Sequence, residues 1–178
     1  QSAATEESAG RGAVKARYRA GMFDLFEKAR AKLKRDLDRD VSFTAIVTKS
    51  LRFTQALVTA PLYLRAVNVL GQGVRTLGRP RIENFGRMAI GAGTLIRSIN
   101  VPVELATGSQ GSLIVGRDCS FNYGVSIGAM KSVQVGDRVR LGPYVMVIDT
   151  EFHDPYDRSK MPEPRPVVIE DDVFVGAK

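Results

Sequence analysis

The sequence lacks several residue types on which whole classes of site depend. Its 178 residues include no tryptophan, one cysteine and one histidine. A lone cysteine, Cys119, excludes an internal disulfide and favours a reducing, cytoplasmic location. A lone histidine, His153, excludes a zinc site built from three histidines, and we expect no metal. No uninterrupted apolar run reaches about 18 residues, so we expect no membrane-spanning helix.

Charge is the next informative feature, because it is unevenly placed. Residues 1–80 hold 15 Lys or Arg against 7 Asp or Glu, whereas residues 81–178 hold 11 against 12. An excess of +8 in one half favours an anionic partner, either a membrane surface or nucleic acid, although a solvated basic helix face is the plain alternative. The basic half lacks interleaved exposed aromatic residues and any known nucleic-acid motif, so we expect no nucleic acid.

The first half is predicted to be helical. Residues 1–12 are small and polar and read as a disordered leader without a secretory signal. Residues 13–80 form a basic α-helical region, in which apolar residues from Val14 to Leu33 recur at spacings of three and four. A second stretch, 43–70, carries little charge, and Pro61 should kink or end its helix. This stretch is expected either to lie on a membrane or to pack on the second half or a neighbouring subunit.

The second half has a period of six. Apolar residues occupy the first position of successive hexads, a small or β-branched residue follows four positions later, and glycine often takes the second position. The first positions are Ile90, Ile96, Val103, Val115, Phe121, Ile127, Val135, Leu141, Val147, Ile169 and Val175. Three hexads make one triangular coil, with the apolar residue inside and glycine allowing the chain to turn at a corner. Residues 81–178 are therefore predicted to form a left-handed parallel β-helix of hexapeptide repeats, which makes the chain mainly β with an α-helical N-terminal extension.

Two interruptions of the period are candidates for function. Ile127 and Val135 are eight residues apart, so a small bulge is expected at 129–132. Val147 and Ile169 are 22 residues apart, so the segment 149–166 must leave the coil. This excursion contains His153 and four of the eight prolines, which favour an ordered loop.

At these residues the sequence resembles the hexapeptide-repeat acyltransferases, in the branch of the galactoside, maltose and xenobiotic acetyltransferases. The matching stretch is 90–178 and includes FNYGVSIGA, VGDRVRLGPYVMVIDTEFHDP and VVIEDDVFVGA. The resemblance implies a homotrimer, with active sites between adjacent prisms and acetyl-CoA as acyl donor. Members continue for several coils beyond this point, so the sequence is expected to stop in mid-coil.

The resemblance also assigns roles to residues. His153 matches the general base on the excursion, and Asn122 matches an asparagine that holds the acceptor or the transition state. Ala177 matches the residue whose backbone N–H binds the oxyanion, and Ala177 and Lys178 are expected to contact coenzyme A. Asp149, Glu151 and Asp154 are the candidates to orient the histidine ring. For Asn122 the plain alternative is a corner residue in a left-handed conformation, and for Cys119 a core position is expected.

Three functions follow as hypotheses. The first is acetyl transfer to a hydroxyl of a glycan or lipid-linked glycan precursor. The second is N-acyl transfer to an amino sugar nucleotide. The third is a non-catalytic β-helical scaffold whose basic helices bind an anionic membrane or a partner at the inner face of the membrane.

Overall fold

The computed structural model describes residues 42–151, 157 and 162–177, together with residues 27, 30, 31, 34 and 35. The fold is mainly β: a parallel β-solenoid preceded by helix α3, Phe43–Tyr63. The strands are β1 (Val69–Leu70), β2 (Arg75–Leu77), β3 (Arg81–Asn84), β4 (Arg87–Ile90), β5 (Leu95–Arg97), β6 (Glu104–Thr107), β7 (Ser112–Val115), β8 (Ser120–Phe121), β9 (Ser126–Ala129), β10 (Ser132–Val135), β11 (Arg140–Leu141), β12 (Met146–Ile148), β13 (Val167–Ile169) and β14 (Phe174–Val175).

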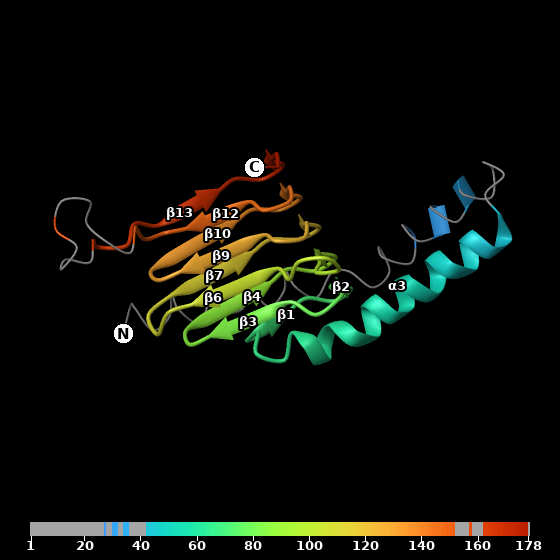
Figure 1. Ribbon diagram of the computed structural model, residues 1–178, viewed down its shortest axis with the longest axis horizontal. Helices are drawn as coiled ribbons and strands as arrows, with labels where there is room; N and C mark the ends of the chain where they lie inside the picture. Colours follow the sequence, from blue (N-terminus) through green and yellow to red (C-terminus); the bar gives the residue numbers. More distant parts are fainter. Residues whose placement is uncertain are drawn as a thin grey trace, which may run out of the picture.

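Each of the first four coils contributes one strand to each of three parallel sheets, and β13 and β14 add a fifth strand to two of them (Figure 1). We name them sheet A (β1-β4-β7-β10-β13), sheet B (β2-β5-β8-β11-β14) and sheet C (β3-β6-β9-β12). The chain passes from A to B to C and back to A, so three corners join the sheets. We call these the A–B, B–C and C–A corners.

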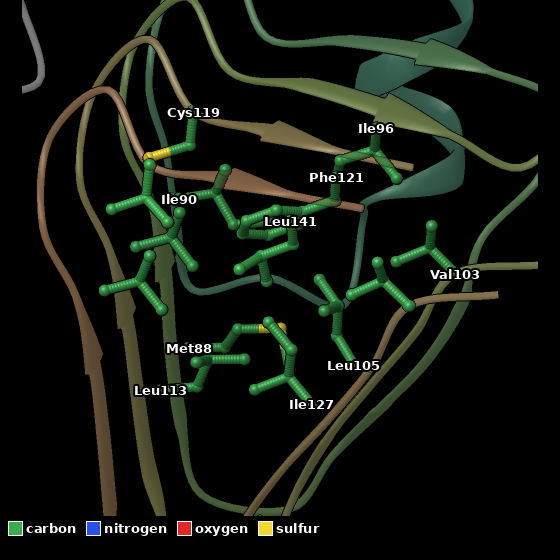
Figure 2. Packing of buried hydrophobic residues seen from close by; sticks show 14 of the residues in the cluster. Met88, Ile90, Ile96, Val103, Leu105, Leu113, Cys119, Phe121, Ile127 and Leu141 are labelled. Carbon is green, nitrogen blue, oxygen red and sulfur yellow. The ribbon is translucent and has the colours of Figure 1, made fainter. Parts of the chain in front are cut away.

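The core is a set of columns that run through the stacked coils. Equivalent residues pair in register from coil to coil, so that each inward side chain lies on another. One column in sheet A is Ile90, Val115, Val135 and Ile169, and one in sheet B is Ile96, Phe121, Leu141 and Val175. Figure 2 shows Ile90, Ile96, Phe121 and Leu141 in the interior among other buried residues of the core. All the apolar first positions expected from the sequence are buried or packed against this core.

One column differs from the sequence interpretation. Leu105, not Val103, pairs with Ile127 in sheet C. Val103 lies at the level of Val125 instead, because the N–H of Glu104 donates to the carbonyl of Val125. The corner before Val103 is longer than the later B–C corners, and the Ser98 hydroxyl accepts a hydrogen bond from the Val103 N–H at 3.1 Å. Both residues are fully buried, which is why the sequence pattern could not choose between them.

The second-position glycines serve a different purpose from the one expected. They do not turn the chain: at the A–B corner the left-handed residues include Gly93, Asp118 and Arg138, with φ of 74°, 56° and 60°. A Cβ on Gly116 would instead lie 2.4 Å from the carbonyl oxygen of Gly136 in the next coil. Glycine is therefore required there because stacked backbones approach too closely for a side chain, and Gly128 lies in strand β9 rather than at a corner.

The sequence predicted that the solenoid starts at residue 81, but it starts earlier. Strands β1 and β2 already belong to sheets A and B. Helix α3 ends at Tyr63, two residues after Pro61, and the following Leu64 is buried in the solenoid core together with Ala60. The end of α3 thus covers the first coil, at the opposite end of the stack from β13 (Figure 1). The earlier helix expected over 14–33 lies mostly outside the described residues.

Candidate functional site

The excursion predicted from the broken period connects β12 to β13. Val133 pairs with Leu113, 20 residues earlier, but with Val167, 34 residues later, so the extra chain lies between two coils that stack normally. The backbone N–H of Arg165 donates to the carbonyl of Asp149 at 2.8 Å, which closes the base of the loop. His153, the expected general base, and Asp154 lie outside the described residues.

Asp149 organises the base of this loop. Its carboxylate is buried and accepts three backbone hydrogen bonds from the bulge after β9: from Met130 at 2.8 Å, Lys131 at 2.7 Å and Ser132 at 2.8 Å. The carboxylate therefore holds the C–A corner of the preceding coil against the first residue of the excursion. Of the three acids considered as partners of His153, Asp149 is thus committed to the scaffold.

A cleft opens beside this anchor. It lies between the bulge at Lys131 and the two ends of the excursion, and its lining includes Ile148, Glu151 and Arg165. Lys131 Nζ pairs with Glu163 Oε1 at 2.8 Å, and this contact lowers the pKa of Glu163 below its ordinary value. The loop base is therefore a charged, partly open surface that can accept a polar ligand.

The other expected site residues lie at the B–C corner. Asn122 follows β8, and its backbone N–H donates to Leu141 in the next coil at 3.0 Å. Gly142 in that coil lies against Gly176 and Ala177 of the following coil: a Cβ on Gly142 would be 2.7 Å from the backbone nitrogen of Ala177. Asn122 and Ala177 therefore share one corner with a single coil between them, about 10 Å apart at the ordinary spacing of strands.

The conformation of Asn122 bears on its role. Its φ is not positive, so the alternative that asparagine serves there for a left-handed corner is wrong. Gly124 and Tyr144 take the left-handed positions of this corner, with φ of 70° and 60°. Asn122 Oδ1 accepts a hydrogen bond from the N–H of Tyr123 at 3.0 Å, and no described residue accepts one from Nδ2. The amide can thus donate to a bound group.

Two tyrosines beside Asn122 were not assigned a role from the sequence. Tyr123 and Tyr144 meet edge to face, with ring centroids 5.5 Å apart and an interplanar angle of 86°. Tyr144 is half exposed, and its ring occupies the space that a Cβ on Gly124 would take, at 2.5 Å. A bulky residue with positive φ is uncommon, and strained backbone of this kind recurs at functional sites as well as at turns. One feature of the sequence indicated this conformation: Tyr144 follows Gly142 and Pro143, where a turn is expected.

The structure places Asn122 and Ala177 at the same corner, one coil apart, and the base of the excursion at a different corner. Asn122 and Ala177 lie at the B–C corner, whereas Asp149 and the base of the excursion lie at the C–A corner, at the opposite edge of sheet C. Comparison with known proteins finds no matching family model, curated protein or solved structure. Lys178 lies outside the described residues.

The remaining candidates are structural. Cys119 is 1% exposed, as expected for a core residue, and its thiol donates to the carbonyl of Gly136 at 3.1 Å. Burial raises the pKa of this thiol from 9.0 to about 11, so it is a poor nucleophile at neutral pH. In the described part of the chain, no three His, Cys, Asp or Glu side chains are grouped as metal ligands.

Proposed function

We propose that the chain is a left-handed hexapeptide-repeat β-helix that transfers an acetyl group from acetyl-CoA to a hydroxyl. The acceptor is a glycan or a lipid-linked glycan precursor, and the active enzyme is a homotrimer. The observation that carries the proposal is the single excursion, anchored by the Asp149 carboxylate, in an otherwise regular parallel solenoid. A stable coil does not require such a loop, and loops carried by a rigid scaffold often hold functional residues.

The proposed chemistry assigns one task to each residue. His153 accepts the proton of the acceptor hydroxyl while the oxygen attacks the thioester carbonyl, because a neutral hydroxyl is a weak nucleophile. The backbone N–H of Ala177 stabilises the oxyanion of the tetrahedral intermediate, and the Nδ2 amide of Asn122 donates to the acceptor or to this intermediate. The intermediate collapses as the C–S bond breaks, and the leaving thiolate takes the proton back from His153.

Covalent geometry supports a site shared between protomers. Asp149 follows Val145 by four residues of extended chain, so sheet C separates the two corners by about 13 Å. His153 follows Asp149 by four residues, which can span about 14 Å at full extension. Within one protomer His153 would have to lie fully extended across sheet C to reach the Asn122 corner. A threefold assembly removes this requirement, because the excursion of one prism can reach the B–C corner of the next.

The first experiment measures acyl transfer by the purified protein. Release of the coenzyme A thiol from acetyl-CoA is followed with a panel of hydroxyl and amine acceptors, and light scattering determines the mass relative to 19.4 kDa. We expect transfer to a hydroxyl acceptor, a trimer, and a loss of about 10² to 10⁴ in kcat for His153→Ala with coenzyme A binding intact. Near-normal kcat in His153→Ala, or transfer only to amines, would contradict the proposal.

Subunit mixing tests whether the site is shared. His153→Ala and Asn122→Ala are purified separately, unfolded together and refolded as mixed oligomers. If each site takes its histidine from one protomer and its asparagine from another, mixed oligomers regain activity that neither parent has. No recovery, with mixed oligomers demonstrated by mass, would place both residues of a site in one protomer.

A further inference from the structure

Helix α3 has two apolar faces, and only one of them is buried. Ile46, Ala56 and Ala60 are buried, and Phe53 lies under the guanidinium of Arg75, 5.0 Å from its carbon. On the opposite side of the helix lies what we call the α3 stripe: Phe43, Val47, Leu51, Val58 and Leu62. At 3.6 residues per turn the centres of the two faces are about 160° apart. Each residue of the stripe is between 39% and 78% exposed.

The charge along α3 and the chain that follows it into the first coil has one sign. Between residues 42 and 81 the chain has six basic residues and no acidic residue; the first acid is Glu83. Lys49 and Arg52 lie on α3 itself and are exposed, as are Arg65 and Arg79 where the helix leads into the first coil. Figure 1 shows that α3 runs beyond the edge of the sheets.

We infer that α3 docks on an anionic membrane surface, with the α3 stripe inserted between the headgroups. A helix that lies in the interface buries its apolar face by about 5–10 Å, and cationic residues beside it are attracted to anionic lipid. At about 1.5 Å per residue the 21 residues of α3 are about 32 Å long, enough for all five stripe side chains to contact one flat surface. No helix among the described residues is long and apolar enough to cross a bilayer. A second copy of the chain would account for the apolar stripe but not for the basic charge of residues 42–81.

The test is co-sedimentation of the full chain with vesicles of phosphatidylcholine alone or of phosphatidylcholine with phosphatidylglycerol. The stripe variant is Leu51→Gln with Val58→Gln. Its matched control is Val168→Gln with Phe174→Gln, two residues that are equally exposed but lie at the other end of the solenoid. Light scattering of each variant runs in parallel, and circular dichroism confirms that each is folded.

We expect binding to anionic vesicles only, decreasing as salt rises, and a loss of about tenfold or more in partitioning for the stripe variant. The control should bind as the unaltered chain does, and no variant should change in oligomer mass. Equal binding to neutral vesicles, unaltered binding by the stripe variant, or no binding at all would overturn the inference. A stripe variant that loses oligomer mass rather than vesicle binding would assign the stripe to a second copy. None of these readouts depends on acyl transfer.

Discussion

Removal of the Asp149 carboxylate is the most informative perturbation of the scaffold. The side chain is 4% exposed and accepts hydrogen bonds from three consecutive backbone N–H groups. Hydrogen bonds to a charged group contribute about 1.5–3 kcal/mol each. The donors belong to Met130, Lys131 and Ser132, of which the first two are exposed enough for water to replace part of each bond. Taking about 1 kcal/mol for each, we expect Asp149→Ala to lower the free energy of unfolding by about 3 kcal/mol.

Guanidinium unfolding followed by circular dichroism measures this loss. Asp149→Asn should lose less, since one amide oxygen can still accept from two of the donors. Glu104→Ala is the matched control: its carboxylate pairs with Arg81 on the exposed surface and should cost far less than Asp149. Hydrogen exchange at the three amides should accelerate in Asp149→Ala alone. A loss no larger than that of the control, or unchanged exchange, would show that the carboxylate does not hold the corner.

Three further predictions follow from backbone geometry and burial. Gly116→Ala should lower the free energy of unfolding by about 3 kcal/mol or more, measured with guanidinium, because the new Cβ meets a backbone carbonyl oxygen. Gly176→Ala is its control: no atom lies within 4 Å of the new Cβ, so the free energy of unfolding should change by less than about 0.5 kcal/mol. Gly124→Ala should cost about 2–3 kcal/mol through its positive φ and its contact with the Tyr144 ring, and Tyr144→Gly should recover part of that loss in the double variant; strict additivity would contradict the contact. Burial raises the pKa of the Cys119 thiol from 9.0 to about 11, so the neutral thiol stabilises the fold fully below pH 9.0 and loses this effect as the pH rises towards about 11. The difference in free energy of unfolding between the unaltered chain and Cys119→Ala should therefore shrink across that range.

The sequence predicted the parts of the structure that repeat. An inward apolar residue recurs in every coil, and because the coils stack in register, a position that is buried once is buried in each coil, as in the column from Ile90 to Ile169. The excursion was equally visible, since no coil can absorb the chain between Val147 and Ile169. Both features can be predicted from the spacing of residues in the sequence, without knowledge of any contact between coils.

What the sequence missed depends on contacts between coils or between elements. Val103 and Leu105 are equally apolar and equally buried, and only the length of the corner before them sets which one pairs with Ile127. The role of Asp149 required three donors that come from residues 17–19 positions earlier. Tyr144 has no propensity for positive φ, so its position depends on the open space above Gly124 in the neighbouring coil. The sequence did not predict the two faces of α3, because apolar residues on both sides of a helix give no single stripe.

The hydrogen bonds of Asp149 offset the free-energy cost of closing the excursion. Closing a loop costs about 0.6 kcal/mol for each doubling of its length, so replacing a corner of a few residues by the segment 149–166 costs only about 1–2 kcal/mol. The hydrogen bonds of Asp149, at about 3 kcal/mol, exceed that cost. The coils on either side keep their register, with Val167 over Val133 and Val175 over Leu141. A solenoid can therefore carry a long loop at one corner without weakening its core, provided that the first residue of the loop is fixed, and Asp149 is the residue that fixes it.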